Sequence, residues 1–276
     1  MKKIKFAIIG NPISHSLSPT MHNYWFKKYN INAEYELLDI EENKIQNVIK
    51  KIKNKEIKGI NVTLPFKKSV IPFLNKIIND ANETHSVNTV MLDRNDNLIG
   101  ENTDVFGFQA AYLKSIPNRE KKNKKALILG AGGVAPSIIL ALIKSNILNI
   151  YLTNRTHEKS LFLKKKFKNI SVLKWNDFSR DLDKFDIIIN ATSLGLKSDD
   201  EFKNDFSHFK KNMIYIDTIY NPSETKMIKY FKTKNVTSLN GLNMFIYQGQ
   251  KAFYLWNKIN PEVDDELLKL LESKLN

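Results

Sequence analysis

A short apolar run that ends in a glycine turn constrains the fold of this chain more than any other feature. Residues 124–136 read KKALILGAGGVAP, and the run 126–129 has the composition of a buried parallel strand. Gly130, Gly132 and Ala135 then follow with the spacing G-x-G-x-x-A. The first glycine of such a motif permits a tight turn, the second lets the backbone approach a pyrophosphate, and the small third residue lets the next helix pack closely. The run therefore predicts the strand–turn–helix unit of a dinucleotide site.

A basic residue follows the second strand of this unit. Pro136 lies in the first turn of a helix predicted over 137–143, whose amides and positive dipole end would face the phosphates. The next apolar strand, 149–153, leads into Arg155, about 20 residues beyond the glycines, where the adenosine ribose would lie. An acidic residue there is typical of NAD, whereas a cation suits a 2′-phosphate. Arg155, with Lys159 four residues on, favours NADP, although Arg155 could instead merely end a solvated strand.

Composition excludes several classes of protein. The 276 residues suit two domains of ordinary size, and no run of about 18 apolar residues predicts a membrane span. The chain has no cysteine, which excludes disulfides and thiolate chemistry, and its five histidines show no metal-binding spacing. The apolar stretch at the N-terminus is too short for a signal peptide, so we expect a first strand and a cytoplasmic protein.

The formal net charge of +14 raises the alternative of a basic, non-enzymatic protein that binds nucleic acid. Only four of the 43 basic residues are arginine, and the lysines are spread along the whole chain. The densest cluster, residues 119–125, is expected to be a solvated linker before the glycine strand. We therefore expect no nucleic-acid partner and no membrane partner.

Alternation of strands and helices predicts an α/β fold with two domains and a cleft between them. We expect an N-terminal α/β domain over 1–103, a Rossmann-type doubly wound domain over 104–240, and final helices in 241–276 that pack back on the first domain. Strands are expected at residues 4–9, 34–40, 57–64, 87–92, 98–101, 126–129, 149–153, 187–190, 214–219 and 236–239. Other helices are expected at 18–29, 44–52, 68–78 and 104–114.

Two serines stand in the loop that leads into the helix predicted at 18–29. The loop places Ser16 and Ser18 beside the unpaired amides of a helix N-terminus, which suits an anion such as a carboxylate. The plainer interpretation is that Ser18 caps the helix, with Pro19 at its first position, and that Ser16 has no role.

Polar residues also follow the carboxyl ends of predicted strands, where ligands gather in open α/β sheets. Thr63 and Lys67 follow one strand, and a free lysine amine titrates near ~10.4, so Lys67 would start as a proton donor. Asp104 follows another strand and could either cap a helix or pair with Lys67. Tyr220 offers a phenol at the end of a later strand, and Gln248 needs a polar partner among apolar neighbours.

Seven motifs between Gly10 and Gln248 together resemble the shikimate dehydrogenase family. They include NPISHSLSP at 11–19, NVTLPFK at 61–67, ENTD at 101–104 and the glycine turn. The resemblance implies reversible NADPH-dependent reduction of 3-dehydroshikimate to shikimate, in aromatic amino acid (chorismate) biosynthesis, by a monomer or homodimer. A quinate/shikimate dehydrogenase with relaxed cofactor use is the alternative within the family. A different two-domain dehydrogenase, acting on folate or amino acids, is a further alternative.

The resemblance also implies roles for individual residues. Lys67 and Asp104 would be the catalytic pair, and the first domain would hold the substrate. Substrate would be bound by Ser16, Ser18, Thr63, Asn88, Asp104, Tyr220 and Gln248. NADP would be bound by Gly130, Ala131, Gly132, Gly133, Val134, Asn154, Arg155, Thr156 and Lys159, with Ile219 and Gly241 at the nicotinamide end.

Three residues depart from the family's usual pattern. Val105 and Asn243 stand where the family usually has glycine, and Lys159 stands where arginine is common. These departures bear on local loop shape and on NADP affinity, not on the class of reaction.

Overall fold

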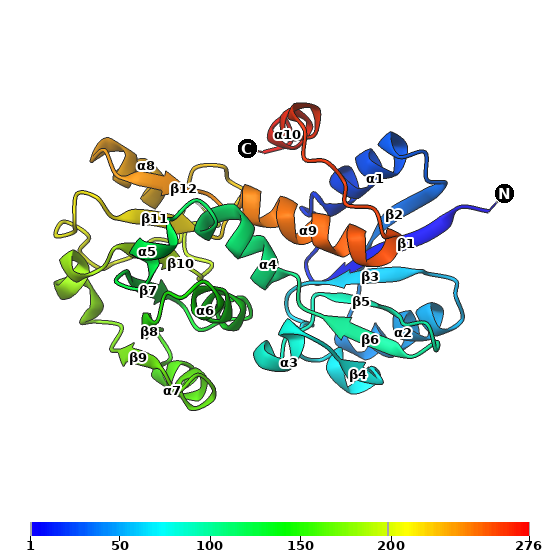
Figure 1. Cartoon of the computed structure of the whole chain (residues 1–276), viewed down its shortest axis with the longest axis horizontal. Coiled ribbons are helices and arrows are strands. Elements are labelled where there is room, and N and C mark those ends of the chain that lie inside the picture. Colours follow the sequence, from blue (N-terminus) through cyan, green and yellow to red (C-terminus); the bar gives the residue numbers. More distant parts are fainter. Residues whose placement is uncertain (1, 198, 276) are drawn as a thin grey trace. The chain divides into compact units, whose positions relative to one another are not determined.

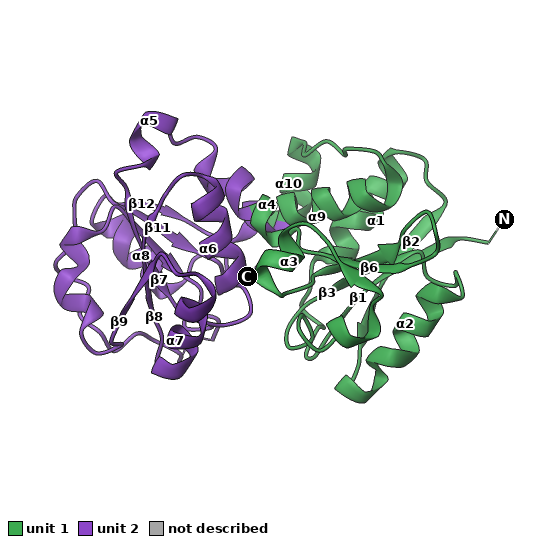
Figure 2. Ribbon diagram, turned by 60° about the horizontal axis from the view of Figure 1, so that its bottom comes forward, with its two compact units in different colours: residues 1–107, 246–274 green, residues 108–245, 275–276 purple. Residues whose placement is uncertain are grey.

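The chain forms two compact units, coloured separately in Figure 2. The computed structural model describes residues 2–197 and 199–275, so positions 1 and 276 of the predicted domain ranges lie outside it. Unit 1 contains residues 1–107 and 246–274, and unit 2 contains residues 108–245 with Leu275. The chain leaves unit 1 within helix α4 (Asp104–Phe108) and returns within helix α9 (Leu242–Asn257).

Unit 1 is built on a mixed six-stranded sheet with the order β2-β1-β3-β5-β6-β4. The strands are β1 (Ile4–Gly10), β2 (Ala33–Asp39), β3 (Gly59–Val62), β4 (Lys76–Ile77), β5 (Thr89–Leu92) and β6 (Leu98–Glu101). Strand β1 runs parallel to β2 and β3, while β5 runs antiparallel to both β3 and β6. The carboxyl ends of β1, β3 and β6 therefore meet at one edge of the sheet, beside the start of β5.

Helices cover both faces of this sheet, and Figure 1 shows α1 and α9 on one side and α2 on the other. The alternation of strand side chains explains this, because Ala7 and Ile9 face the core that contains α2, whereas Phe6 packs on Phe26 and Trp256. In α2, Ile45 and Ile52 are fully buried at helical spacing. The helices of unit 1 are α1 (Ser18–Lys28), α2 (Ile45–Lys53), α3 (Asp80–Thr84), most of α9, and α10 (Asp265–Glu272).

Unit 2 is a fully parallel sheet with the order β12-β11-β10-β7-β8-β9. The strands are β7 (Lys125–Leu129), β8 (Asn149–Thr153), β9 (Ile170–Leu173), β10 (Ile187–Asn190), β11 (Ile214–Asp217) and β12 (Thr237–Leu239). Its helices include α5 (Asn118–Lys121), α6 (Ala135–Lys144), α7 (His157–Lys166) and α8 (Lys226–Thr233). Counted from β7, the order is 3-2-1-4-5-6, the doubly wound Rossmann arrangement, so the predicted fold class is confirmed.

Several local predictions were wrong. Residues 68–78 form turns, a short 3₁₀ helix (Ile71–Phe73) and strand β4 instead of a helix. Pro72 has no amide hydrogen for a helical hydrogen bond, and the end of the segment pairs with β6. Strand β9 was not predicted at all. The segment 104–114 is helical, but its second half, Gln109–Leu113, is a π-helix.

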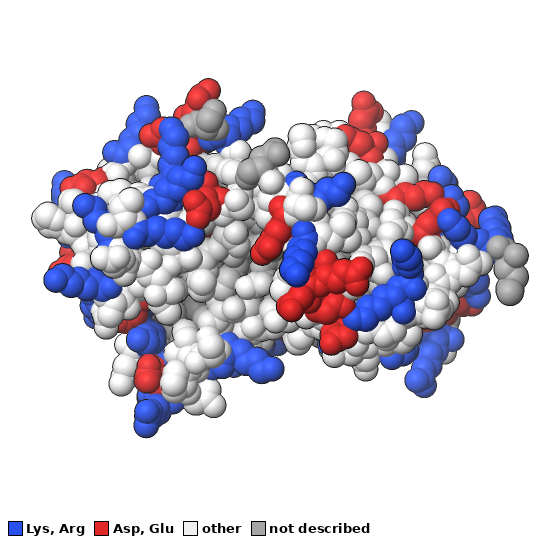
Figure 3. Space-filling view, turned by 90° about the horizontal axis from the view of Figure 1, so that it is seen from above, with Lys and Arg blue, Asp and Glu red and all other residues white. Residues whose placement is uncertain are grey.

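Positive charge is dispersed over the surface rather than gathered. Figure 3 shows lysine and arginine side chains in separate groups, interrupted by acidic side chains, on the face that it presents. Several lysines form ion pairs with acidic side chains. Lys5 pairs with Glu36 and Lys55 with Asp96, each with 2.9 Å between the Nζ and a carboxylate oxygen. Within the described ranges, no helix combines the length and the apolar character that crossing a bilayer requires.

A histidine lies in the aromatic core of unit 1. His22 of α1 is fully buried, and its ring stacks on Tyr35 with 4.4 Å between centroids and an interplanar angle of 4°. Among the described residues, neither of its ring nitrogens has a hydrogen-bond partner. Burial lowers the pKa of His22 from its ordinary 6.5 to about 3, because water is excluded from the charged imidazolium. His22 therefore stays neutral in the folded protein.

His22→Phe is expected to make the protein less sensitive to acid. Since folding depresses the pKa of His22, its contribution to stability is present above pH 6.5 and is lost as pH falls toward 3. Wild type should lose about 3 kcal/mol more unfolding free energy than the variant between pH 7 and about pH 4.5. Urea unfolding at both pH values measures this difference. The exposed His208, replaced in the same way, is the matched control, and equal losses in all three proteins would contradict the expectation.

Candidate active site

Lys67 and Asp104 meet at the edge of the unit 1 sheet where strands β3 and β6 end. The Lys67 Nζ donates to Asp104 Oδ2 at 2.6 Å, and the two side chains are only 13% and 7% exposed. They lie 37 residues apart in the sequence, and the parallel direction of β3 and β6 brings them together. Of the two roles that the sequence left open for Asp104, the structure therefore favours pairing with Lys67.

The start of α4 is capped by another residue, which leaves the Asp104 carboxylate available. Asp104 is the first residue of α4, and Asn102 Oδ1 accepts from the amides of Asp104 and Val105 at 3.0 and 3.4 Å. Asn102 thus satisfies the amides that Asp104 would otherwise have to cap. Val105, the residue after Asp104, is fully buried within α4.

Asn88 connects two other predicted site residues, Asp104 and Gln248. Its buried amide donates to Asp104 Oδ1 at 2.9 Å and to Gln248 Oε1 at 3.3 Å, and it also reaches Thr103 Oγ1. Gln248 projects from α9, so the polar partner that the sequence demanded for it is Asn88. Asn88 thus holds the Asp104 carboxylate through Oδ1, the oxygen that Lys67 does not contact.

Ser16 and Ser18 lie at the same edge, after strand β1. Ser16 Oγ donates to Ser18 Oγ at 3.1 Å and accepts from the Ser18 amide at 3.3 Å. The prediction that Ser18 caps α1 was wrong, because Leu17 is the capping residue and Ser18 is the first helical residue. Thr63 is half-buried directly after β3, and its amide donates to Ile9 O at 3.0 Å. The serine hydroxyls are thus held near a helix start without serving as its cap.

Sequence reasoning missed two buried residues of this edge, Tyr35 and Asn61. The Tyr35 hydroxyl donates to Asn61 Oδ1 at 2.7 Å, and Asn61 Nδ2 donates to Asn88 O at 3.0 Å. Asn61 stands in the NVTLPFK motif, which was a signal that could have identified it, whereas nothing in its spacing distinguishes Tyr35.

In unit 2, the glycine turn lies at the carboxyl end of β7. Gly130 adopts φ +109°, and a Cβ there would lie 2.8 Å from Ala191 O, so a side chain is excluded. A Cβ at Gly132 would make only an ordinary van der Waals contact, with Ala191 O at 3.9 Å. Asn154 Oδ1 accepts from the Ala131 amide at 3.0 Å and fixes the turn against the end of β8.

The turn leads into a helix start that is open to an anion. Val134 precedes α6, its side chain supplies no cap, and Pro136 occupies the first turn as predicted. Arg155, Thr156 and Lys159 are exposed at the start of α7 and just before it. Backbone amides at a helix start and nearby cations are the groups that bind phosphate.

A buried carboxylate shapes the loop after β11. Asp217 accepts hydrogen bonds from the Ile219 amide, Thr225, Asn190 and Tyr215, over 2.9–3.2 Å. Burial raises the pKa of Asp217, and these hydrogen bonds oppose that effect. The loop so formed holds Ile219, whose carbonyl accepts from the Gly241 amide at 2.9 Å.

Tyr220 follows Ile219 in this loop, and its ring stacks on Phe245 at 4.8 Å. Both residues belong to unit 2, whereas the other predicted substrate residues belong to unit 1. The contacts of unit 1 therefore do not bring Tyr220 together with them.

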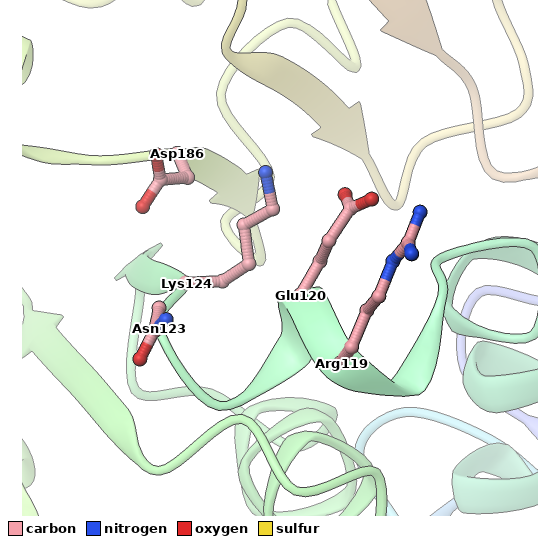
Figure 4. A pocket seen from close by; sticks show the side chains of 5 residues that line it. All are labelled: Arg119, Glu120, Asn123, Lys124 and Asp186. Atoms are coloured by element: carbon pink, nitrogen blue, oxygen red, sulfur yellow. The ribbon is translucent and has the colours of Figure 1, made fainter.

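The basic cluster 119–125 lines a pocket away from the glycine turn. Its lining residues are Arg119, Glu120, Asn123, Lys124 and Asp186, and Figure 4 shows Arg119 and Glu120 projecting from α5. Asp186 and Lys125 stand at the amino ends of β10 and β7, opposite to the end that carries Gly130. The expected linker therefore contains a short helix, and its pocket is separate from the candidate dinucleotide site. In the described part of the chain, no three His, Asp or Glu residues are grouped to hold a metal ion.

Two family models match the chain, one in each half. A model described as the shikimate dehydrogenase substrate binding domain matches residues 8–90. A model described as shikimate / quinate 5-dehydrogenase matches residues 113–243. The first range contains Ser16, Ser18 and Lys67, and the second contains the glycine turn.

Similar proteins extend over the whole chain. A shikimate dehydrogenase (NADP(+)) of Pelagibacter ubique is 50% identical over 272 residues, which cover 99% of this chain and 100% of that protein. The crystal structure of shikimate dehydrogenase from Aquifex aeolicus has a TM-score of 0.88 at 35% identity, covering 99% and 97%. Shikimate 5-dehydrogenase from Thermus thermophilus, in complex with NADP(H) and shikimate, has a TM-score of 0.87 at 27% identity, covering 99% and 100%. With sequence and fold alike over its entire length, the chain belongs to the shikimate dehydrogenase family.

Proposed function

We propose that this protein catalyses the reversible NADP-dependent reduction of 3-dehydroshikimate to shikimate, a step of aromatic amino acid biosynthesis. The observation that carries the proposal is the buried pair of Lys67 and Asp104 at 2.6 Å, in a network of polar side chains at one sheet edge. A 50% identical relative named shikimate dehydrogenase (NADP(+)) supports the same reaction.

In this reaction Lys67 would be the group that moves a proton. Its ammonium would donate to the substrate carbonyl oxygen during reduction and would stabilise the negative charge that develops there. In the reverse direction the Lys67 amine would take the hydroxyl proton. Asp104 holds the amine in place through one carboxylate oxygen, while Asn88 holds the other oxygen. Bound NADPH would supply the hydride, which no side chain of the protein can provide.

The remaining residues of the unit 1 edge would bind the substrate. Ser16 and Ser18 would donate hydrogen bonds to its carboxylate, because hydroxyls at a helix start suit an anion. Thr63, Asn88 and Gln248 would bind the ring hydroxyls, and Asn88 and Gln248 already contact each other at 3.3 Å. We also propose that Tyr220, from unit 2, contributes to substrate binding.

The carboxyl edge of the unit 2 sheet fits a dinucleotide. The missing side chain at Gly132 and the start of α6 suit a pyrophosphate, and the exposed Arg155 suits a 2′-phosphate. The full set proposed for NADP is Gly130, Ala131, Gly132, Gly133, Val134, Asn154, Arg155, Thr156, Lys159, Ile219 and Gly241.

Initial rates with shikimate and quinate, each with NADP and with NAD, test the proposal directly. We expect reduced-nicotinamide absorbance to rise fastest with shikimate and NADP. Folded protein that gives no turnover with this pair would overturn the proposed function, and faster turnover of quinate would change the proposed substrate.

Arg155→Ala is expected to raise KM for NADP by about 10- to 100-fold, since it removes a charge-assisted hydrogen bond to the 2′-phosphate. KM for NAD, which lacks that phosphate, should change less than about twofold. Steady-state kinetics with both cofactors measure the difference. Arg119→Ala removes a cation of the basic cluster and is the matched control. Similar losses for both cofactors would exclude the phosphate contact.

A further inference from the structure

Asn102 contacts more of unit 1 than the start of α4. Its Oδ1 accepts from the Asp104 amide at 3.0 Å. Its Nδ2 donates to Thr84 Oγ1 at 3.1 Å and to Ser86 O at 2.9 Å. All three of the residues that this amide group joins through side chain or carbonyl are buried, as is Asn102 itself. The Asn102 side chain therefore links the start of α4 to the segment 84–88, which leads into β5.

The segment 84–88 also contacts both members of the Lys67–Asp104 pair. The Val87 amide donates to Lys67 O at 2.8 Å and so holds the backbone of the lysine. The Asn88 side chain donates to Asp104 Oδ1 at 2.9 Å and so holds the carboxylate. The position of this segment relative to α4 therefore affects the distance between the Lys67 amine and the Asp104 carboxylate.

The orientation of the Asn102 amide group is fixed by its neighbours. Its oxygen faces the Asp104 amide, which can only donate, and its nitrogen faces Ser86 O, which can only accept. Aspartate and serine cap a helix start about as well as asparagine does. Of the three, only asparagine carries a separate NH₂ group beside the capping oxygen. The start of α4 alone therefore does not account for asparagine at this position.

We propose that Asn102 is a positioning residue that holds Asp104 at the distance from Lys67 that proton transfer requires. The proposal rests on the proposed function, in which Lys67 moves the proton and Asp104 holds its amine. The Lys67 Nζ lies 2.6 Å from Asp104 Oδ2, so a small displacement of α4 would misalign the amine. Misplacement by about 1 Å can lower the rate of an enzyme by about 10²-fold.

Asn102→Ser tests the proposal, because serine retains a capping oxygen and removes the NH₂ group that reaches Thr84 and Ser86. We expect kcat for shikimate oxidation to fall about 10- to 100-fold, and KM for NADP to change less than about twofold. Asn23→Ser is the matched control, because Asn23 also forms a bridge in unit 1. Its Oδ1 accepts from the Tyr35 amide at 2.9 Å, and its Nδ2 donates to Tyr35 O at 3.1 Å. The kcat of this control should stay within about twofold of wild type.

The double variant Asn102→Ser/Asp104→Ala shows whether Asn102 acts through Asp104. If it does, kcat of the double variant equals that of Asp104→Ala alone, because no carboxylate is left to misplace. A residue that only supports the fold would lower kcat by the same factor in both backgrounds.

Thr84→Val provides a second, milder variant, since it removes one acceptor of the Asn102 NH₂ group and leaves the cap of α4 intact. We expect its kcat to fall about threefold, which corresponds to the loss of one neutral hydrogen bond. This loss should also disappear in the Asp104→Ala background. Circular dichroism shows which variants fold, and Thr84→Val decides the question where Asn102→Ser does not.

Three results would each overturn the inference: independent effects in the double variant, an unchanged kcat in folded Asn102→Ser, and an equal loss of kcat in Asn23→Ser. Wild-type protein that fails to oxidise shikimate would overturn the proposed function first, and this inference with it. With normal wild-type turnover, each of the three results overturns the inference alone.

Discussion

Lys67→Ala is expected to lower kcat by about 10²–10⁴-fold, the usual contribution of a general acid or base. KM for shikimate should change less than about threefold, because the ammonium acts on charge that develops in the transition state. Initial rates over a range of shikimate concentrations at saturating NADP measure both quantities.

Lys68→Ala is the matched control, since it removes the neighbouring, exposed lysine from the same turn. Its kcat should stay within about twofold of wild type. A Lys67 variant that raises only KM would show that Lys67 binds substrate without moving a proton. Circular dichroism of the variant separates loss of chemistry from loss of fold, because Asp104 is left buried without its cation.

Gly130→Ala and Gly132→Ala are expected to fail in different ways. Gly130→Ala places a Cβ on a residue whose backbone has φ +109°, and this Cβ would lie 2.8 Å from a backbone oxygen. The substitution should therefore lower the unfolding free energy by about 2–4 kcal/mol. The second meets nothing closer than 3.9 Å and should cost less than about 1 kcal/mol. It should nevertheless raise KM for NADP at least about tenfold, because the Cβ would occupy the approach of the pyrophosphate.

Urea unfolding and NADP kinetics on both variants measure these differences. Equal destabilisation would contradict the distinction between a glycine that the fold needs and one that the cofactor needs. Unchanged NADP kinetics in Gly132→Ala would remove the pyrophosphate from this turn. Neither variant touches the unit 1 sheet, so the intrinsic chemistry of Lys67 serves as an internal reference at saturating NADP.

The features predicted correctly depend on short stretches of sequence. The glycine turn with its flanking strand and helix is specified within about a dozen residues, and the hairpin of β5 and β6 is specified by one turn. The helix predicted over 68–78 was wrong because the conformation of this segment depends on pairing with β6, more than 20 residues further along the chain. Local helix propensity did not contain that information.

The candidate site shows the same division. The family resemblance implied that Lys67 and Asp104 form a pair, but their spacing in the sequence could not show that they meet, and the course of the strands does. Arg155 could be predicted because it lies at a fixed distance from the glycines. Tyr35 could not be predicted, because a phenol on an edge strand looks like any half-buried tyrosine until its acceptor is known.

The two crossings of the chain between its units affect how the protein folds while it is being translated. Residues 108–245 are continuous, so every strand of the Rossmann sheet has been synthesised before α9 is complete. The N-terminal sheet is translated first, yet its aromatic core needs Phe253 and Trp256 to pack on Phe6 and His22. The nascent chain thus carries an unfinished first unit while the second one closes, and that unit is completed only by the last helices to be synthesised.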